Sequence, residues 1–393
     1  MEINGELVNE EVRYADLGLS QALMQAVQKK GYVQATPVQG GAIPYFMEYR
    51  DVIAKAPTGT GKTFAFGIPM VEHIDPECAD VQGLVLAPTR ELAVQIQEEL
   101  RDLCEFKEGV RTVCLYGGAP IDRQINTLKK KPQIVVATPG RLMDHMKRRT
   151  VRLDKVQTVV LDEADRMLDM GFVRDVTRIL DQLKHRRNLG MFSATISREV
   201  MDISWVYQRD PVEITVRADE QNKPDITQYR LDVDRNEKVD TMVRLMEIGG
   251  YDRVIAFCNT KNMTDRLSGL LRMRNISCEA IHGDIQQRIR EKTLEKFKRG
   301  EIKVLVATDV AARGLDIDDV DAVFNYDVPD ELENYTHRIG RTGRAKRHGV
   351  AYTFIATITE GIRMDDIVRN TKAEVQRLRY DADGCLMLVE DGK

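Results

Sequence analysis

The chain has 393 residues, more than one hydrophobic core usually holds, and this length predicts two domains. Its composition is 42% hydrophobic and 31% charged, with 27 Gly and 12 Pro, which excludes a disordered or fibrous chain. The formal net charge of -4 does not attract polyanions, so any surface that binds nucleic acid must be a local basic patch.

Cysteine spacing and hydropathy indicate in which cellular compartment the protein works. The 6 cysteines include no C-x-x-C pair, so we expect no zinc site and a reduced intracellular environment. No stretch reaches the roughly 18 apolar residues that span a bilayer, and the N-terminus lacks the basic and apolar regions of a signal peptide. We therefore expect a cytoplasmic protein without membrane contact. Nothing in the sequence requires an oligomer, and a monomer is expected.

In the first half, short apolar runs alternate with amphipathic segments. Runs that are apolar throughout are typical of strands buried on both faces of a parallel sheet, and the amphipathic segments between them indicate helices. The predicted strands are DVIAKA from Asp51, GLVLAP from Gly83, QIVVATP from Gln133, TVVLDEAD from Thr158 and LGMFSAT from Leu189. The first half is predicted to be an α/β domain.

A second series follows a polar break. The segment RADEQNKPD from Arg217 lacks periodicity and contains a proline, so we place a linker at 217–224 between domains 1–216 and 225–378, with a short tail at 379–393. Further predicted strands are RVIAFCNT from Arg253, ISCEAIHG from Ile276, KVLVATD from Lys303, DAVFNYDVP from Asp321 and GVAYTFIAT from Gly349. Two such lobes are expected to leave a cleft, with ligands at the carboxyl ends of the strands.

The segment APTGTGKT, which begins at Ala56, follows a predicted strand and precedes an apolar helical segment. This is the context of a P-loop, although its first residue is Ala56 and not glycine. Glycines let backbone amides surround phosphate oxygens, a lysine neutralises the β and γ phosphates, and a threonine hydroxyl binds Mg²⁺. The alternative is a glycine-rich turn without a ligand. The predicted phosphate-binding residues are Thr58, Gly59, Thr60, Gly61, Lys62 and Thr63.

The acidic segment DEAD, which begins at Asp162, ends the predicted strand TVVL. We expect Asp162 to hold Mg²⁺ through water and Glu163 to orient the attacking water, because phosphoryl transfer depends mainly on positioning and charge. By itself the segment is more typical of the N-terminus of a solvated helix, where negative charge is favourable. The P-loop upstream favours the hydrolytic interpretation.

The basic segment HRIGRTGR, from His337, lies in the second half. Arg341 and Arg344 are three residues apart, so on a helical turn both point the same way and can reach the γ-phosphate as arginine fingers. The alternative is an ordinary solvated basic face.

Together, these motifs resemble those of the DEAD-box RNA helicase family, and they occur in the family's order from Tyr14 to Arg344. The motif set is GYVQATPVQ from Gly31, APTGTGKT, APTREL from Ala87, TPGR from Thr138, DEAD, SAT from Ser193, HGD from His282, ATDVAARGLD from Ala307 and HRIGRTGR. The resemblance implies two tandem RecA-like domains, each a mostly parallel sheet flanked by helices. It also implies an RNA-stimulated ATPase that uses ATP and Mg²⁺ and locally unwinds short RNA duplexes, with hydrolysis coupled to release.

For the nucleotide, the resemblance implies that Gln39 reads the adenine edge, which an amide with a donor and an acceptor suits. It implies that Tyr14, where the family usually has phenylalanine, stacks on the adenine. Asp316 is implied to bind the ribose. Ser193 and Thr195 are implied to couple hydrolysis to strand separation, and strand-end capping is their structural alternative.

For RNA, the resemblance implies backbone contacts that are salt-dependent and largely indifferent to base sequence. The implied residues are Arg90, Gly118, Thr138 and Arg141 in the first domain, and Thr260, Gly283, Arg290 and Thr308 in the second. Each has a structural alternative, such as a turn or an exposed charge. No substrate-selecting module is visible at either end, so the protein either acts broadly or takes its specificity from protein partners.

Two other functions stay open at this point. One is a DNA helicase or translocase built on similar paired lobes, for which DNA would stimulate hydrolysis. The other is an RNA clamp or scaffold with slow turnover, which would retain RNA tightly in the presence of ATP.

Overall fold

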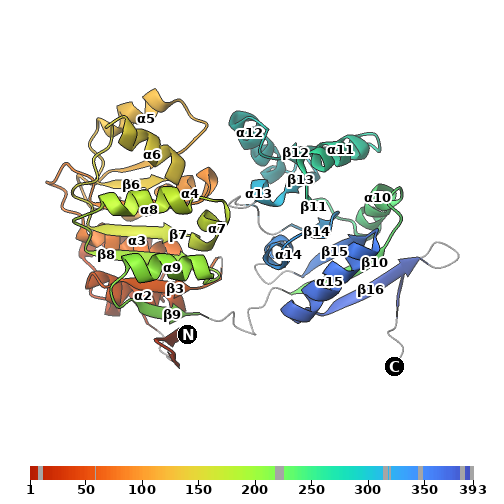
Figure 1. The fold of residues 1–393 in the computed structure, drawn as a ribbon, viewed down its shortest axis with the longest axis horizontal. Coiled ribbons are helices and arrows are strands. Elements are labelled where there is room, and N and C mark those ends of the chain that lie inside the picture. The colour runs from red at the N-terminus through yellow and green to blue at the C-terminus, as the bar shows by residue number, and fades with distance from the viewer. Residues whose placement is uncertain are drawn as a thin grey trace. The chain divides into compact units, whose positions relative to one another are not determined.

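The computed structural model describes residues 1–7, 12–57, 59–216, 225–312, 317, 320–343, 348–380 and 386–389. The chain divides into two units, Met1–Glu220 and Gln221–Lys393. Each unit contains one mostly parallel sheet flanked by helices, which confirms the predicted fold class (Figure 1). None of the described helices is long and apolar enough to cross a membrane.

The first unit contains one sheet with the strand order β2-β1-β9-β3-β8-β7-β4-β6-β5. Its strands are β1 (Glu2–Ile3), β2 (Glu6–Leu7), β3 (Val52–Lys55), β4 (Gly83–Leu86), β5 (Thr112–Leu115), β6 (Ile134–Ala137), β7 (Thr158–Asp162), β8 (Asn188–Ser193) and β9 (Val212–Thr215). Strand β1 runs antiparallel to β2 and β9, and the pairs from β9 to β5 are parallel.

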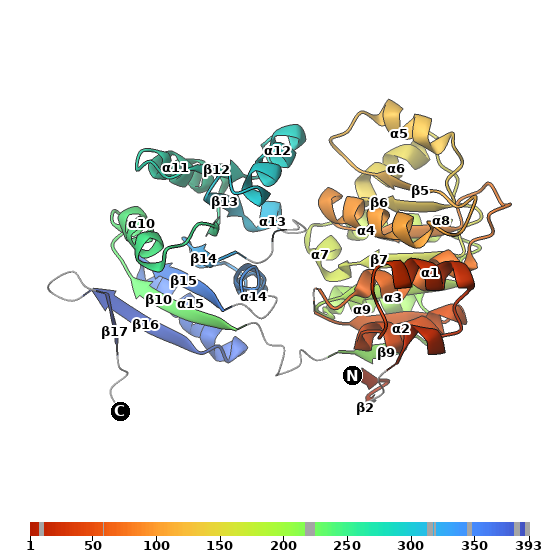
Figure 2. The same ribbon diagram turned by 180° about the vertical axis from the view of Figure 1, so that it is seen from behind.

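Helices cover both faces of this sheet. They are the 3-10 helix η1 (Tyr14–Asp16), α1 (Gln21–Lys29), α2 (Pro37–Met47), α3 (Lys62–His73), α4 (Arg90–Leu103), α5 (Ile121–Leu128), α6 (Pro139–Lys147), α7 (Ala164–Asp169), α8 (Val173–Gln182) and α9 (Arg198–Tyr207). Helices α8 and α9 lie in front of the sheet in Figure 1, whereas α1, α3 and α4 lie in front in Figure 2. Successive strand residues point to opposite faces of the sheet and pack into two hydrophobic cores, one on each face. Val85 packs into the core on the side of α1, α3 and α4, and Leu84 and Leu86 pack into the core on the side of α8 and α9.

The second unit repeats this architecture with the strand order β12-β13-β11-β14-β15-β10-β16-β17. Its strands are β10 (Ile226–Asp232), β11 (Val254–Cys258), β12 (Cys278–Ile281), β13 (Val304–Thr308), β14 (Ala322–Asn325), β15 (Gly349–Ile355), β16 (Val375–Tyr380) and β17 (Leu386–Leu388). Its helices are α10 (Lys238–Gly249), α11 (Lys261–Arg272), α12 (Gln287–Lys298), α13 (Asp309–Ala312), α14 (Leu332–Ile339) and α15 (Ile358–Thr371).

Each strand predicted from an apolar run is present, and both sheets contain further strands: β1, β2, β5 and β9 in the first, and β10, β16 and β17 in the second. Strand β17 pairs antiparallel with β16, so the sheet extends into the segment 379–393 that was expected to be a tail. The expected linker, 217–224, lies outside the described residues.

Strand order places the motifs along one edge of the first sheet. Neighbouring parallel strands present their carboxyl ends at the same edge, which is where ligands bind in sheets of this type. The P-loop follows β3, SAT ends β8 and DEAD ends β7, whereas APTREL, TPGR and Gly118 follow β4, β6 and β5. The hydrolytic motifs therefore lie at the ends of the adjacent strands β3, β8 and β7, and the predicted RNA residues lie at the ends of the adjacent strands β4, β6 and β5.

Candidate active site

The P-loop leads from β3 into α3, and two of its glycines have backbone conformations that other residues rarely adopt. Gly59 and Gly61 have φ values of +81° and +85°. A Cβ on Gly61 would also lie 2.4 Å from Nε2 of Gln39, so the turn and the close approach both require glycine. Lys62 is the first residue of α3, and its Nζ donates to the carbonyl of Ala56 at 3.0 Å. Thr58 lies outside the described residues.

A cavity of about 380 Å³ contains this loop and the predicted hydrolytic residues. Its lining includes Tyr14, Gln39, Gly59, Gly61, Lys62, Thr63, Asp162 and Glu163. These residues come from four separate segments of the chain, and the fold brings them together in one cavity. Thr60 lies beside them, where its hydroxyl donates to the carbonyl of Pro57 at 2.8 Å.

Gln39 is bound to both the P-loop and the N-terminus of α2. Its Nε2 donates to the carbonyl of Gly61 at 3.0 Å, and its Oε1 accepts from the backbone N–H of Thr36 at 2.8 Å. The hydroxyl of Tyr14 donates to the same Oε1 at 2.6 Å. Thr36 makes a second link, from its hydroxyl to the carbonyl of Thr60 at 2.8 Å.

The two tyrosines of this cavity differ in exposure. Tyr14 is only 2% exposed. Tyr32, which lies in the motif GYVQATPVQ, is 48% exposed and packs edge-on against Phe64 with ring centroids 5.5 Å apart. Tyr32 is therefore the more exposed of the two rings in this cavity. Sequence spacing does not reveal this difference in burial.

Asp162 and Glu163 end β7, and both are buried. Burial raises the pKa of the Asp162 carboxyl to about 7, although the nearby Lys62 opposes this shift. Glu163 has a φ of +48°, a left-handed conformation that is costly for a residue with a side chain and is concentrated at functional sites. Its Oε2 accepts from Arg166 at 2.7 Å in a buried ion pair that the sequence did not predict.

Asp165 connects DEAD to SAT. The backbone N–H of Asp165 donates to Ser193 Oγ at 3.1 Å, and the hydroxyl and the N–H of Thr195 donate to Oδ2 of Asp165 at 2.7 and 3.0 Å. Burial alone would raise the pKa of Asp165, but the hydrogen bonds from Ser193 and Thr195 outweigh it and lower that pKa. The predicted coupling residues therefore contact the acidic motif directly.

The same cavity offers oxygen ligands suited to Mg²⁺. No cluster of three or more acidic, histidine or cysteine side chains that could hold a metal occurs among the residues described. Mg²⁺ bound with a nucleotide needs none, because it is usually held by one or two protein oxygens together with phosphates and water. The carboxylate of Asp162 and the hydroxyl of Thr63 fit that requirement.

Predicted RNA residues of the first unit converge on the loop after β5. The Arg90 guanidinium carbon lies 4.2 Å from the centre of the Tyr116 ring, and Arg141 donates to the carbonyl of Ala119 at 3.0 Å. Gly118, between them, has a φ of +82°, and Thr138 is the residue before α6. The loop thus joins residues from three strand ends into one surface.

In the second unit, Thr260, Gly283 and Thr308 follow or end the adjacent strands β11, β12 and β13. Thr260 caps α11 by accepting from the N–H of Met263 at 3.2 Å, and Arg290 donates to the carbonyl of Ala311 at 3.1 Å. These four predicted RNA residues therefore gather at one sheet edge. Arg341 follows α14, and Asp316 and Arg344 lie outside the described residues.

Arg338, in the same basic motif as Arg341, has a different environment. It is 1% exposed, and its Nε and one Nη donate to the two carboxylate oxygens of Asp309, each at 2.6 Å. Further bonds reach the carbonyl of Asp327 at 2.7 Å and Oδ1 of Asn259 at 2.8 Å. Arg338 is a structural residue, which the repetition of arginines in the motif did not reveal.

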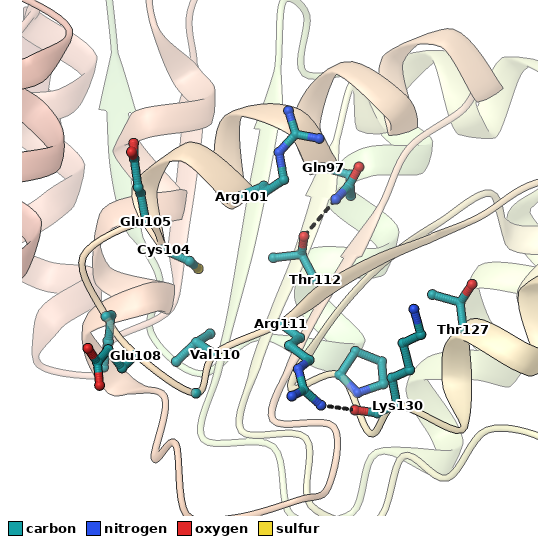
Figure 3. A pocket seen from close by; sticks show the side chains of 13 residues that line it. Gln97, Arg101, Cys104, Glu105, Glu108, Val110, Arg111, Thr112, Thr127 and Lys130 are labelled. Carbon is teal, nitrogen blue, oxygen red and sulfur yellow. Dashed lines mark hydrogen bonds between the residues drawn. The ribbon is translucent and has the colours of Figure 1, made fainter.

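A second cavity, of about 480 Å³, lies beside the edge strand β5 (Figure 3). Gln97 donates to the hydroxyl of Thr112 at 2.7 Å there, and Arg111 donates to the carbonyl of Lys130 at 2.8 Å. It contains none of the predicted site residues, so it is separate from the cavity around the P-loop.

Comparisons with known proteins agree with this geometry. The family model described as DEAD/DEAH box helicase matches residues 36–203, and the one described as helicase conserved C-terminal domain matches residues 237–346. The DEAD-box ATP-dependent RNA helicase CshA of Bacillus cereus is 46% identical over 365 residues, which cover 93% of this chain and 69% of the relative. CshA of Bacillus subtilis is also 46% identical, with 94% and 74% covered.

Among solved structures, S. cerevisiae Dbp5 bound to RNA and ADP BeF3 superposes with a TM-score of 0.83 at 31% identity, covering 93% of this chain and 95% of that one. A DEAD box protein from Methanococcus jannaschii is 37% identical with a TM-score of 0.53, covering 94% and 100%. The two units therefore match tandem RecA-like domains.

Proposed function

Because the chain belongs to the DEAD-box family of ATP-dependent RNA helicases, we propose that the cavity around the P-loop is its ATP site and that RNA stimulates its hydrolysis. The observation that carries this assignment is the convergence of Gln39, Lys62, Asp162 and Glu163 on one cavity. These residues supply contacts for the base, the phosphates, the metal and the attacking water.

For the nucleotide, Lys62 binds the β and γ phosphates once it leaves the carbonyl of Ala56. Asp162 and Thr63 hold Mg²⁺, which neutralises phosphate charge when it is bound. Glu163 orients and deprotonates the attacking water. The half-exposed Tyr32, and not the buried Tyr14, stacks on the adenine.

For RNA, we assign backbone binding to the predicted residues at the two sheet edges, with positive charge from Arg90, Arg141 and Arg290. Phosphate contacts of this kind act on any sequence and weaken as salt rises. Relatives support RNA as the substrate, since Dbp5 was solved with RNA bound. Hydrolysis also needs Arg341 of the second unit, so ATP turnover depends on both units. We place the protein in the cytoplasm as a monomer whose partners supply any target specificity.

The P-loop assignment is tested by measuring ATP affinity in the Lys62→Ala variant. Hydrogen bonds to charged groups contribute about 1.5–3 kcal/mol, so we expect the Kd for ATP to rise about ten- to a hundredfold. Lys155→Ala, an exposed lysine of the same unit that does not line the cavity, is the matched control and should bind ATP normally. Unchanged affinity in Lys62→Ala would contradict the assignment.

A further inference from the structure

Tyr14 contributes a hydroxyl to the nucleotide cavity at a position where a phenylalanine would have none. The side chain lines the cavity and is 2% exposed. Its hydroxyl donates to Oε1 of Gln39 at 2.6 Å. Burial raises the pKa of Tyr14 far above its ordinary value, so the hydroxyl keeps the proton that it donates across the physiological range.

The orientation of the Gln39 amide does not depend on Tyr14, because two backbone groups determine it. The N–H of Thr36 can only donate, and it lies 2.8 Å from Oε1. The carbonyl of Gly61 can only accept, and it lies 3.0 Å from Nε2. The oxygen that Tyr14 meets is therefore one that already accepts a hydrogen bond from the backbone.

The remaining hydrogen-bonding capacity of Gln39 follows by counting. An amide oxygen has two acceptor positions, and an amide nitrogen carries two hydrogens. Thr36 and Tyr14 fill both acceptor positions, and the carbonyl of Gly61 takes one hydrogen. One N–H donor remains, and no acceptor.

A purine base offers different groups to a hydrogen-bond donor and to a hydrogen-bond acceptor on the protein. Adenine and guanine both offer N7 as an acceptor, whereas the 6-amino group of adenine is a donor and needs an acceptor on the protein. We propose that Tyr14 is a positioning residue that fills the second acceptor position of Gln39, so that Gln39 reads N7 and the 6-amino group of ATP contributes little to binding. The proposal rests on the proposed function, in which Gln39 faces the base.

The test compares equilibrium Kd values for three nucleotides, with the full chain. Purine riboside triphosphate lacks the 6-amino group, and 7-deaza-ATP lacks N7. For the unmodified protein we expect the first to bind within about twofold of ATP and the second to bind about three- to tenfold more weakly, the range that one hydrogen bond supports. In Tyr14→Phe the freed acceptor should make loss of the 6-amino group cost about three- to tenfold as well.

Tyr207→Phe is the matched control. Its hydroxyl donates to Asp181 at 2.8 Å in the same unit and does not line the cavity, so the variant should give the same nucleotide ratios as the unmodified protein. A purely structural effect of Tyr14→Phe would weaken all three nucleotides together and leave their ratios unchanged, which would overturn the proposal.

Two further outcomes also count against the proposed role of Tyr14. They show whether that role alone fails or whether the proposed function fails with it. If 7-deaza-ATP binds more weakly but the unmodified protein already loses tenfold without the 6-amino group, Gln39 faces the base and only the role of Tyr14 is wrong. If neither analogue differs from ATP in either protein, Gln39 does not read the base, and both assignments fail.

Discussion

At Glu163, backbone conformation and ion pairing together define where the carboxylate lies. The left-handed φ of +48° places Glu163 at the start of α7, and Arg166, one helical turn later, holds its Oε2 at 2.7 Å. Both side chains are less than 10% exposed. The carboxylate is therefore fixed beside the P-loop lysine and Asp162 in the same cavity.

Glu163→Gln should retain ATP and RNA binding and lose hydrolysis, because the amide keeps the size of the side chain but cannot accept the proton of water. We expect single-turnover hydrolysis to slow about 10²- to 10⁴-fold, and the complex with ATP and RNA to persist longer than that of the unmodified protein. Glu108→Gln, in the separate cavity beside β5, should leave the rate unchanged. Rapid turnover by Glu163→Gln would show that another group activates the water.

Individual residue roles were only partly predictable from the sequence. Gln39, Lys62, Asp162 and Glu163 stand in motifs whose chemistry requires proximity, and they do line one cavity. Tyr14 and Tyr32 both line that cavity, but which ring is buried depends on packing that sequence spacing does not show. The Arg166 ion pair was missed for the same reason, because the sequence does not show that this arginine is buried against Glu163.

Helix α14 and the turn after it separate two arginines that look alike in the sequence. Arg338, within α14, binds Asp309 of α13 and the carbonyl of Asp327, whereas Arg341 follows the helix and is partly exposed. Arg338 therefore joins the segments that carry Thr308 and Arg341. A short motif thus contains one structural arginine and one that we assign to catalysis.

Replacing each arginine with methionine should distinguish these roles. Arg338→Met removes a buried guanidinium and leaves the carboxylate of Asp309, which is only 16% exposed, without this partner, so it should destabilise the second unit by about 3 kcal/mol, as chemical denaturation would measure. Arg341→Met should change stability by less than about 1 kcal/mol yet lower RNA-stimulated hydrolysis by about 10³-fold or more. The reverse pattern, with Arg341 controlling stability, would refute both assignments.

Among the elements, buried strands were predictable and peripheral ones were not. Strands such as β4 and β6 are buried at every position, and they read as continuous apolar runs. Strands β5 and β10 carry polar residues at half-exposed positions, so they show no such run. The antiparallel β17 was expected to be tail because three residues carry too little pattern to predict a strand.

For the whole molecule, the division of site residues between two units has a thermodynamic consequence. The predicted phosphate contacts lie in the first unit and Arg341 in the second, while both carry predicted RNA residues. If ATP and RNA favour the same arrangement of the chain, each must tighten the binding of the other by the same factor. The rate of ATP hydrolysis should then depend on RNA. Neither the ATP site nor the RNA site would produce this dependence by itself.

Steady-state ATP hydrolysis without nucleic acid, with single-stranded RNA and with single-stranded DNA of the same sequence tests this account most directly. Strong stimulation by RNA, little by DNA, and loss of the stimulation as salt rises are the expected results, since the contacts are to the RNA backbone and its 2′-hydroxyls. Equal stimulation by DNA would contradict RNA selectivity. No stimulation by either, with tight ATP-dependent retention of RNA, would mean that the protein is a clamp.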